Sequence, residues 1–255
     1  MRCKITVIGE GDVAAGAALR LRERGTVQVT SSPDAAGVGG DAVVVVCDPA
    51  SELPAIGRDL ARRAPSAVVV VASAGAEAAC LTLLDATAFP RSRVLGLGGT
   101  AATIRVRDAL AVALGVALHD VTALVLGGEE AGLVPVRAAT TVAGVPAAIA
   151  AASTDPTGGL RDAAAEEEIA AVVARELATA PARAARALAA ADIAEAVALD
   201  RGRVLTCSLL LRGELGLRDV VAGVPAVVAG RGVERVLEVP LADDERAALA
   251  RAAIG

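Results

Sequence analysis

The sequence is poor in aromatic, histidine and lysine side chains. Its 255 residues include no Trp, no Tyr, one Phe and one His, and Arg supplies nearly all of the positive charge. Because Trp and Tyr are missing, neither ring can stack on a bound base, and the core must be packed with small aliphatic side chains. The formal net charge is −5, and no basic patch with interleaved aromatic residues is present. We therefore expect no nucleic-acid partner.

Long apolar runs and paired cysteine motifs are missing as well. No apolar run approaches the roughly 20 residues of a membrane-spanning helix, so no membrane partner is expected. The first residues form a short strand and then a glycine loop, unlike a secretion signal, so we expect a cytoplasmic protein. The four Cys residues form no CxxC pair, and His119 is the one imidazole. We predict no metal site, and buried free thiols where Cys falls in strands or helices.

The first half alternates strands with helices. A buried strand at 5–8 leads into the loop Gly9-Glu10-Gly11-Asp12-Val13-Ala14 and a helix to about residue 24. This unit opens dinucleotide-binding folds, where Gly9, Gly11 and Ala14 would let the backbone approach a pyrophosphate at the helix N-terminus. Further strands are predicted at 27–30, 42–46, 67–71 and 93–95, with helices at 53–63, 76–86 and 100–114. The alternation favours a parallel sheet with right-handed crossovers.

The second half has another pattern. Strands are predicted at 121–126, 133–136 and 140–142, followed by Ala-rich helices at 162–177 and 183–199. Residues 203–211, 220–228 and 233–239 are typical of an antiparallel meander with glycine turns, and a helix is predicted at 242–253.

Several segments are similar to those of one known family and occur in the same order. Residues 89–99 read FPRSRVLGLGG, residues 124–135 LVLGGEEAGLVP, residues 141–146 TVAGVP and residues 213–220 GELGLRDV. The first three resemble FPKNRVIGMGG, LVLGGHGDSMVP and STVAGIP, in that order, which are segments of the lactate/malate dehydrogenase family. The fourth resembles part of the C-terminal sheet in the malate dehydrogenase branch of that family. The resemblance covers residues 4–22 and most of the chain from residue 66. It implies an α/β fold, with a truncated Rossmann-type parallel sheet in residues 1–120 and an α+β dehydrogenase C-terminal domain with antiparallel sheet in residues 121–255.

The positions that carry the family's chemistry differ. In the family, a histidine exchanges a proton with the substrate hydroxyl while NAD takes the hydride, and an aspartate orients that histidine. The resemblance places Glu129 at the histidine and Ala102 at the aspartate. Because an unperturbed Glu titrates near pH 4.3 and His near 6.5, a proton carrier suited to neutral pH is lost. We predict no catalytic residues of the family's kind, although burial could raise the pKa of Glu129 enough for a general acid.

Arg105 matches the family arginine that grips the substrate carboxylate through two hydrogen bonds. It is therefore a candidate for residual substrate binding. The alternative, which we favour, is an ion pair between this helix arginine and a nearby acid, with Glu129 among the candidates.

Two family segments lack a counterpart. After the first helix the chain passes directly to residues 27–30, which align with the family's third strand, so the second strand and its ribose-binding acid look deleted. The lid with its substrate-binding arginines is reduced to residues 50–58, too short to close the site against water. Glu10 and Asp12 add two carboxylates near the pyrophosphate position. Repulsion between each carboxylate and a bound phosphate would weaken binding by on the order of 1 kcal/mol. We expect no cofactor, with NAD as the alternative.

These departures lead to three functional hypotheses. The first is a catalytically inactive malate-dehydrogenase-like protein that acts as a structural or regulatory subunit, in an oligomer with itself or with an active malate dehydrogenase-like subunit. The second is a divergent NAD-dependent 2-hydroxy-acid oxidoreductase that uses Glu129 and Arg105. The third is a non-catalytic sensor of a small anion or nucleotide.

Overall fold

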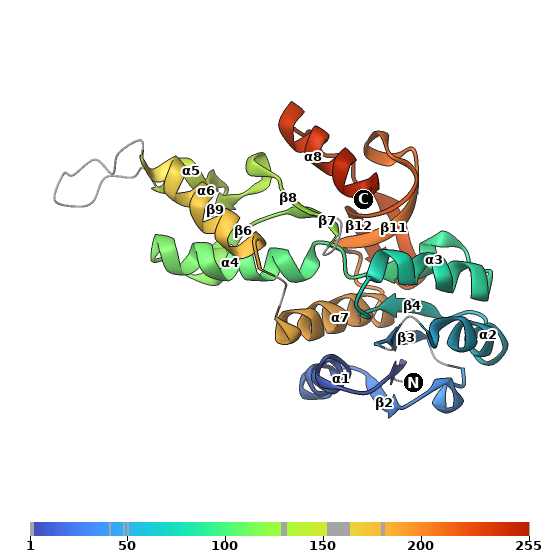
Figure 1. The fold of residues 1–255 in the computed structure, drawn as a ribbon. Coiled ribbons are helices and arrows are strands. Elements are labelled where there is room, and N and C mark those ends of the chain that lie inside the picture. The colour runs from blue at the N-terminus through green and yellow to red at the C-terminus, as the bar shows by residue number, and fades with distance from the viewer. Residues whose placement is uncertain are drawn as a thin grey trace.

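The fold is built on one eight-stranded mixed sheet (Figure 1). A computed structural model describes residues 3–40, 42–47, 49, 51–128, 132–151, 164–179 and 182–254. The strands lie in the order β13-β12-β11-β5-β4-β3-β1-β2. Their bounds are β1 Lys4–Ile8, β2 Gln28–Ser32, β3 Val43–Val46, β4 Val68–Val71, β5 Val94–Gly96, β11 Arg203–Arg212, β12 Arg218–Ala229 and β13 Gly232–Val236.

The parallel part comprises β1 to β5, as the alternating pattern predicts. Its central strands β3 and β4 each read Val-Val-Val-Val, and all eight side chains are buried. Both faces of such strands are covered by helices, so a continuous β-branched run suits them better than an alternating one.

β2 lies in a different position from that of the third strand whose sequence it matches. It pairs in parallel with β1, from Lys4 opposite Gln28 to Ile8 opposite Ser32. In the strand order 3-2-1-4-5-6 of the doubly wound fold, the neighbour of the first strand is the second strand. The physical reason is the edge of β1, whose backbone N–H and C=O groups need a partner when the second strand is missing.

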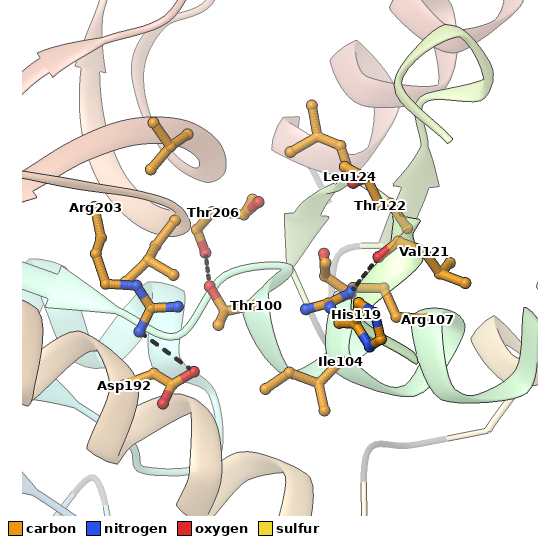
Figure 2. A pocket seen from close by; sticks show the side chains of 14 residues that line it. Thr100, Ile104, Arg107, His119, Val121, Thr122, Leu124, Asp192, Arg203 and Thr206 are labelled. Atoms are coloured by element: carbon orange, nitrogen blue, oxygen red, sulfur yellow. Dashed lines mark hydrogen bonds and ion pairs between the residues drawn. The ribbon is translucent and has the colours of Figure 1, made fainter. Parts of the chain in front are cut away.

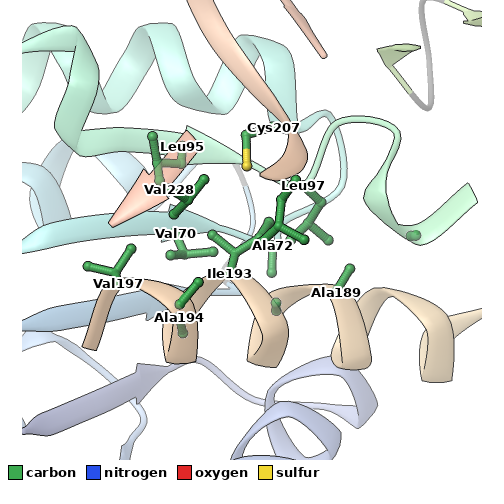
Figure 3. Close-up of a cluster of buried hydrophobic side chains, with 14 of the residues drawn as sticks. Val70, Ala72, Leu95, Leu97, Ala189, Ile193, Ala194, Val197, Cys207 and Val228 are labelled. Atoms are coloured by element: carbon green, nitrogen blue, oxygen red, sulfur yellow. The ribbon is translucent and has the colours of Figure 1, made fainter. Parts of the chain in front are cut away.

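Helices cover both faces of the sheet (Figure 1). One face carries α1 (Asp12–Arg24) and α7 (Arg183–Ala198), which pack against each other, and the other carries α2 (Leu53–Arg63) and α3 (Ala76–Thr87). Figure 3 shows α7 placing Ile193, Ala194 and Val197 against Val70 and Val228, which belong to the parallel and antiparallel strands. The Ala-rich helix thus joins both halves of the chain in one core, where small side chains allow close approach.

The predicted meander is confirmed, and it continues the parallel sheet. β11 pairs antiparallel with β12, β12 with β13, and Ser208 of β11 pairs with Gly96 of β5. The two-domain division at residue 120 remains a prediction, but the sheet and its largest core cluster extend across it.

The predicted strand at 121–126 is wrong in one respect, because it is two strands. β6 (Val121–Thr122) joins a small sheet with β9 (Thr141–Val142) and β10 (Val145–Pro146), whereas β7 (Val125–Gly128) pairs with β8 (Gly132–Pro135). Where β6 gives way to β7, the Val125 N–H donates to Thr103 Oγ1 at 3.1 Å and the Val136 N–H donates to Leu124 O at 2.9 Å. These contacts lie where the chain passes from one sheet to the other.

The remaining helices are α4 (Thr100–Leu114), α5 (Ala147–Ala151), α6 (Ala164–Leu177) and α8 (Asp243–Ile254). α5 was not predicted from the sequence. α4, α5 and α6 enclose a separate apolar cluster with β6 and β7. Within the part of the chain that the structure describes, no helix combines the length and the apolar character needed to cross a membrane.

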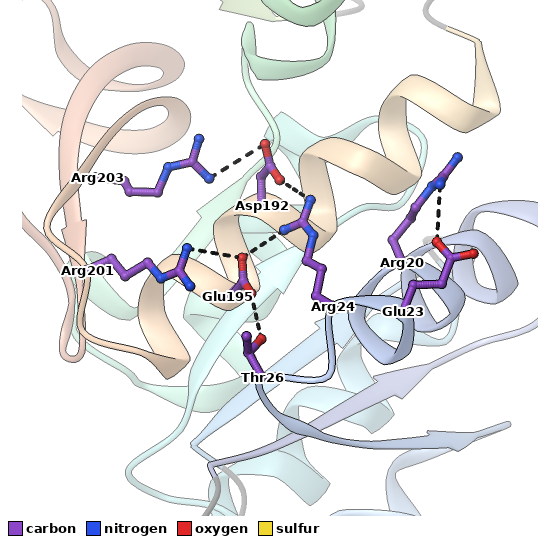
Figure 4. Close-up of polar contacts among 8 residues, drawn as sticks. All are labelled: Arg20, Glu23, Arg24, Thr26, Asp192, Glu195, Arg201 and Arg203. Carbon is purple, nitrogen blue, oxygen red and sulfur yellow. Dashed lines mark hydrogen bonds and ion pairs between the residues drawn. The ribbon is translucent and has the colours of Figure 1, made fainter.

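An ion-pair cluster ties α1 to α7 and to the start of β11 (Figure 4). Glu195 of α7, whose side chain is 5% exposed, pairs with Arg24 at 3.0 Å and Arg201 at 3.6 Å and accepts the Thr26 hydroxyl at 2.6 Å. Asp192, one turn earlier, pairs with Arg24 and with Arg203. Burial alone would raise the pKa of Glu195, but its hydrogen bond from Thr26 and the charges of Arg24 and Arg201 lower it.

Candidate functional site

The carboxyl ends of β1, β3 and β4 meet at a cavity of about 340 Å³, which we call the glycine-loop cavity. Open α/β sheets bind ligands at the carboxyl ends of their strands, at the point where the strand order reverses. In this sheet that point lies between β1 and β3. The cavity is lined by Glu10, Gly11, Asp12, Val13, Cys47, Ala72, Ala74, Arg183 and Arg186.

Of the predicted loop residues, Gly11 lines this cavity, and Gly9 lies two residues before it, directly after β1. Gly9 and Gly11 have φ values of 111° and 96°, in the region that favours glycine. The Gly9 N–H donates to Ser32 O at 3.0 Å, and a Cβ atom on Gly11 would meet nothing within 4 Å. The side chain of Ala14 is buried on the inner side of α1, where a small residue allows close packing of the helix on the sheet. The loop therefore keeps an open backbone cradle.

Two arginines from α7 enter the cavity, and sequence reasoning missed both. Arg183, the first residue of α7, forms an ion pair with Asp12, the first residue of α1. Arg186 Nη2 donates to Ala72 O at 2.9 Å, just beyond the end of β4. The signal in the sequence was their spacing of three in an otherwise Ala-rich segment, which puts both on one helix face.

The segments that follow β2 and β3 border the same edge of the sheet as this cavity. Asp34 follows β2 by two residues, and its carboxylate accepts the Ala36 N–H at 2.8 Å. An acid therefore stands after the strand beside β1, although it caps a short 3-10 turn. Residues 47–52 alone connect β3 to α2, which agrees with the short segment expected in place of a lid.

Ala102 lies in the first turn of α4 and is 2% exposed. Its methyl group belongs to the apolar cluster formed with Val106, Val121 and Val125. Glu129 lies outside the described residues.

A carboxylate that the sequence did not single out stands at the end of β7. Glu77, in the first turn of α3, accepts the hydroxyl of the buried Ser208 at 2.7 Å. A Cβ atom on Gly128 would lie 2.5 Å from Glu77 Oε1, so this carboxylate occupies the space beside the last residue of β7. Its hydrogen bond fixes α3 to β11.

Arg105 is held by α6 and the residues after it. Its Nη2 lies 3.0 Å from Glu176 Oε2 and donates to Thr179 Oγ1 at 2.6 Å, and Nη1 donates to Thr179 O at 2.9 Å. The side chain is 17% exposed. Of the two alternatives, the described contacts favour the ion pair, with Glu176 as the acid.

We therefore expect Arg105→Gln to lower the free energy of unfolding by about 1.5–3 kcal/mol, because hydrogen bonds to a charged group contribute that much. Thermal unfolding followed by far-UV circular dichroism would measure the loss. Arg62→Gln is the matched control, since Arg62 is 72% exposed in its pair with Asp59 and should change stability by less than about 1 kcal/mol. Equal losses in the two variants would contradict a structural role for Arg105.

A second cavity, of about 290 Å³, lies between α4, β6 and the start of β11 (Figure 2). Two of its polar side chains are held by backbone acceptors: Arg107 Nε donates to Val121 O at 2.9 Å, and Thr100 Oγ1 donates to Thr206 O at 2.7 Å. His119 at its rim is 84% exposed and lies 3.3 Å from Asp120. A third cavity, of about 440 Å³, is lined mainly by aliphatic side chains of β8, α5 and α6.

The cysteines are free thiols. Cys80 and Cys207 are buried, as predicted for thiols in helices and strands, and Cys3 and Cys47 are half-buried. Burial raises the pKa of Cys207 to about 12, and burial together with the charge of Glu77 raises that of Cys80. Both thiols therefore stay protonated and unreactive at neutral pH. The described residues hold no cluster of three or more His, Cys, Asp or Glu side chains suited to a metal.

Comparison with known proteins gives one consistent result. The model of the lactate/malate dehydrogenase alpha/beta C-terminal domain matches residues 102–254. A malate dehydrogenase of Thermomicrobium roseum is 33% identical, over 99% of this chain and 96% of that protein. One from Staphylococcus carnosus is 31% identical, over 91% and 81%. The structure of malate dehydrogenase from Salinibacter ruber superposes with a TM-score of 0.83 at 27% identity, covering 98% of this chain and 94% of that one. With the motifs in the same order and the same sheet beneath them, this chain belongs to the lactate/malate dehydrogenase family.

Proposed function

We propose that this chain is a catalytically inactive member of its family and acts in the cytoplasm as a structural or regulatory subunit. The observation that carries the proposal is the environment of Ala102. A catalytic histidine is oriented by an acidic side chain within hydrogen-bond reach of its imidazole. The buried methyl group of Ala102, packed among Val106, Val121 and Val125, supplies none.

The engagement of Arg105 also supports this proposal. Bidentate recognition of a substrate carboxylate requires the guanidinium edge that donates two parallel hydrogen bonds. Here Nη1 and Nη2 already donate to Thr179 and Glu176. A substrate would have to displace contacts that hold α4 to the end of α6.

The partner that we propose is a second copy of this chain or an active malate dehydrogenase-like subunit. The sheet edge at β2 supports this part of the proposal. Backbone groups on the outer side of a terminal strand can pair with another chain. β2 reads Gln-Val-Thr-Ser-Ser and has neither the charged side chains nor the Pro that protect edge strands.

The glycine-loop cavity favours, as a second candidate function, a sensor that binds a small anion without turnover. It retains the open cradle at Gly11 and gains the cationic side chains of Arg183 and Arg186. The names of the relatives favour the other alternative, a divergent oxidoreductase, only weakly, because a name describes the relative and not the residues of this chain.

We expect the purified chain to oxidise NADH in the presence of oxaloacetate with a kcat/KM at least about 10³-fold below that of an active malate dehydrogenase, since a positioned general acid contributes roughly 10²–10⁴-fold. An absorbance assay at pH 7.5 measures this directly. A rate within tenfold of the active enzyme would overturn the proposal in favour of the oxidoreductase.

Light scattering of the chain alone, and mixed with an active malate dehydrogenase, tests the subunit role.

A further inference from the structure

We infer that the side chain of Arg186 closes the glycine-loop cavity to a dinucleotide such as NAD. The inference rests on the proposed function, because it concerns why this family member would not use the family's cofactor. It assigns the exclusion to one residue of α7 rather than to the loss of loop or lid segments.

The position of Arg186 follows from the sheet topology. β2 and β3 flank β1, so the strand order reverses at β1. In doubly wound folds the pyrophosphate lies at the N-terminus of the first helix, and the two halves of the dinucleotide extend to either side across the crevice. One half must therefore cross the carboxyl ends of β3 and β4.

Arg186 occupies the space at the carboxyl ends of β3 and β4. Its backbone belongs to α7, and its guanidinium reaches the carbonyl oxygen of Ala72, the residue that follows β4, at 2.9 Å. Cys47, which follows β3, and Ala74 line the same cavity. The half-buried side chain of Arg186 thus crosses the space above the strand ends and is anchored there by a backbone acceptor.

The cavity that remains is small. Its volume of about 340 Å³ is near the lower end of the range of roughly 300–1,000 Å³ for sites that enclose drug-sized ligands. A dinucleotide is larger than such ligands. The residues present therefore do not fit NAD, although the glycine cradle alone would.

Arg183 provides a matched comparison. It lies one helical turn before Arg186 and carries the same charge, but it is 76% exposed and pairs with Asp12, which is 67% exposed. Its guanidinium is at the entrance beside the pyrophosphate position, where a cation attracts phosphate and also compensates the Asp12 carboxylate. Removal of Arg183 should weaken the binding of a phosphate-bearing ligand, whereas removal of Arg186 should open space for one.

Substitution of the two residues should change the affinity for NADH differently, although each substitution removes the same charge. Arg186→Ala and Arg183→Ala each remove one positive charge, and by electrostatics alone both should weaken the binding of anionic NADH. We expect Arg186→Ala to bind NADH at least tenfold more tightly than the unsubstituted chain. We expect Arg183→Ala to bind no more tightly than that chain. A gain in spite of a lost cation is the signature of steric closure.

The test is isothermal titration of the full chain and each variant with NADH up to millimolar concentration. Ala favours helices, and Arg186→Ser is a second variant that opens the same space if the first does not fold. Circular dichroism confirms folding before each titration. If Arg186→Ala and Arg186→Ser bind NADH no better than the unsubstituted chain, including the case in which none binds, Arg186 does not close the cavity.

Failure of this inference is distinguishable from failure of the proposed function. Turnover of oxaloacetate by the unsubstituted chain would overturn the proposed function, whatever the variants do. Micromolar NADH binding by the unsubstituted chain would overturn the closure by Arg186 directly. Absence of turnover together with unchanged binding in the Arg186 variants would leave the proposed function standing and reject the closure alone.

Discussion

Gly223→Ala should lower the free energy of unfolding by about 3 kcal/mol, at the upper end of the cost of overpacking. Gly223 lies in β12 opposite Ser208 of β11. A Cβ atom there would be 2.0 Å from Gly127 O and 3.0 Å from Gly98 Cα. Both neighbours are backbone, so no side chain can rotate away, and β7 and the loop before α4 must shift. The melting temperature should fall by roughly 6–12 °C, measured by far-UV circular dichroism.

The same substitution at Gly39 is the control. A Cβ atom at Gly39 would meet nothing within 4 Å, and its backbone is outside the left-handed region. Gly39→Ala should change stability by less than about 1 kcal/mol, in the stabilising direction, because it restricts the unfolded chain. If Gly223→Ala were as stable as Gly39→Ala, β12, β7 and the loop before α4 would not meet as closely as described.

The second large effect is expected at Glu195. Glu195→Ala removes the buried carboxylate that holds Arg24, Thr26 and Arg201. Breaking a buried ion pair leaves its partners without compensation and costs about 3 kcal/mol or more. Chemical unfolding in urea, followed by circular dichroism, measures the difference. Since Arg24 is the last residue of α1, Thr26 follows that helix and Glu195 lies on α7, the loss should loosen the packing of these two helices.

Glu23→Ala on α1 is the matched control for this prediction. Glu23 forms a pair with Arg20 at 3.2 Å, but both side chains are more than half exposed (Figure 4). Exposed pairs contribute less than about 1 kcal/mol. Equal destabilisation by the two variants would mean that burial of the cluster around Glu195 does not matter for stability.

The stability contributed by Glu195 should depend on pH in one direction. Its pKa in the folded chain is below the ordinary value of 4.5. A carboxyl group with a lowered folded pKa stabilises the fold at pH values above its unfolded pKa, and this stabilisation is lost as the pH falls through the folded pKa. The difference between the unsubstituted chain and Glu195→Ala should therefore be constant from pH 6 to 8 and shrink below about pH 4.5. A difference that grew with acidification would contradict the ion-pair explanation.

The local pattern of the sequence was sufficient for most elements. Runs of consecutive valines predicted β3 and β4, and the strand, glycine loop and helix at residues 5–24 predicted the first βα unit. The break between β6 and β7 was missed because the apolar run continues through it, while the hydrogen bonds that split it come from Thr103 and Val136. Periodicity reports on neighbouring residues and contains no information about such partners.

The family, the alternation of strands and helices, and the replacement of the family's acid by Ala102 could all be inferred from residue types and their local order. The place of β2 beside β1, the pairing of Arg105 with Glu176 and the entry of Arg186 into the glycine-loop cavity depend on three-dimensional packing. Arg186 and Ala72 are far apart along the chain and meet because α7 crosses the sheet. Strand neighbours and ion pairs are chosen by packing and by the cost of unpaired polar groups, which act between segments that the linear pattern does not connect.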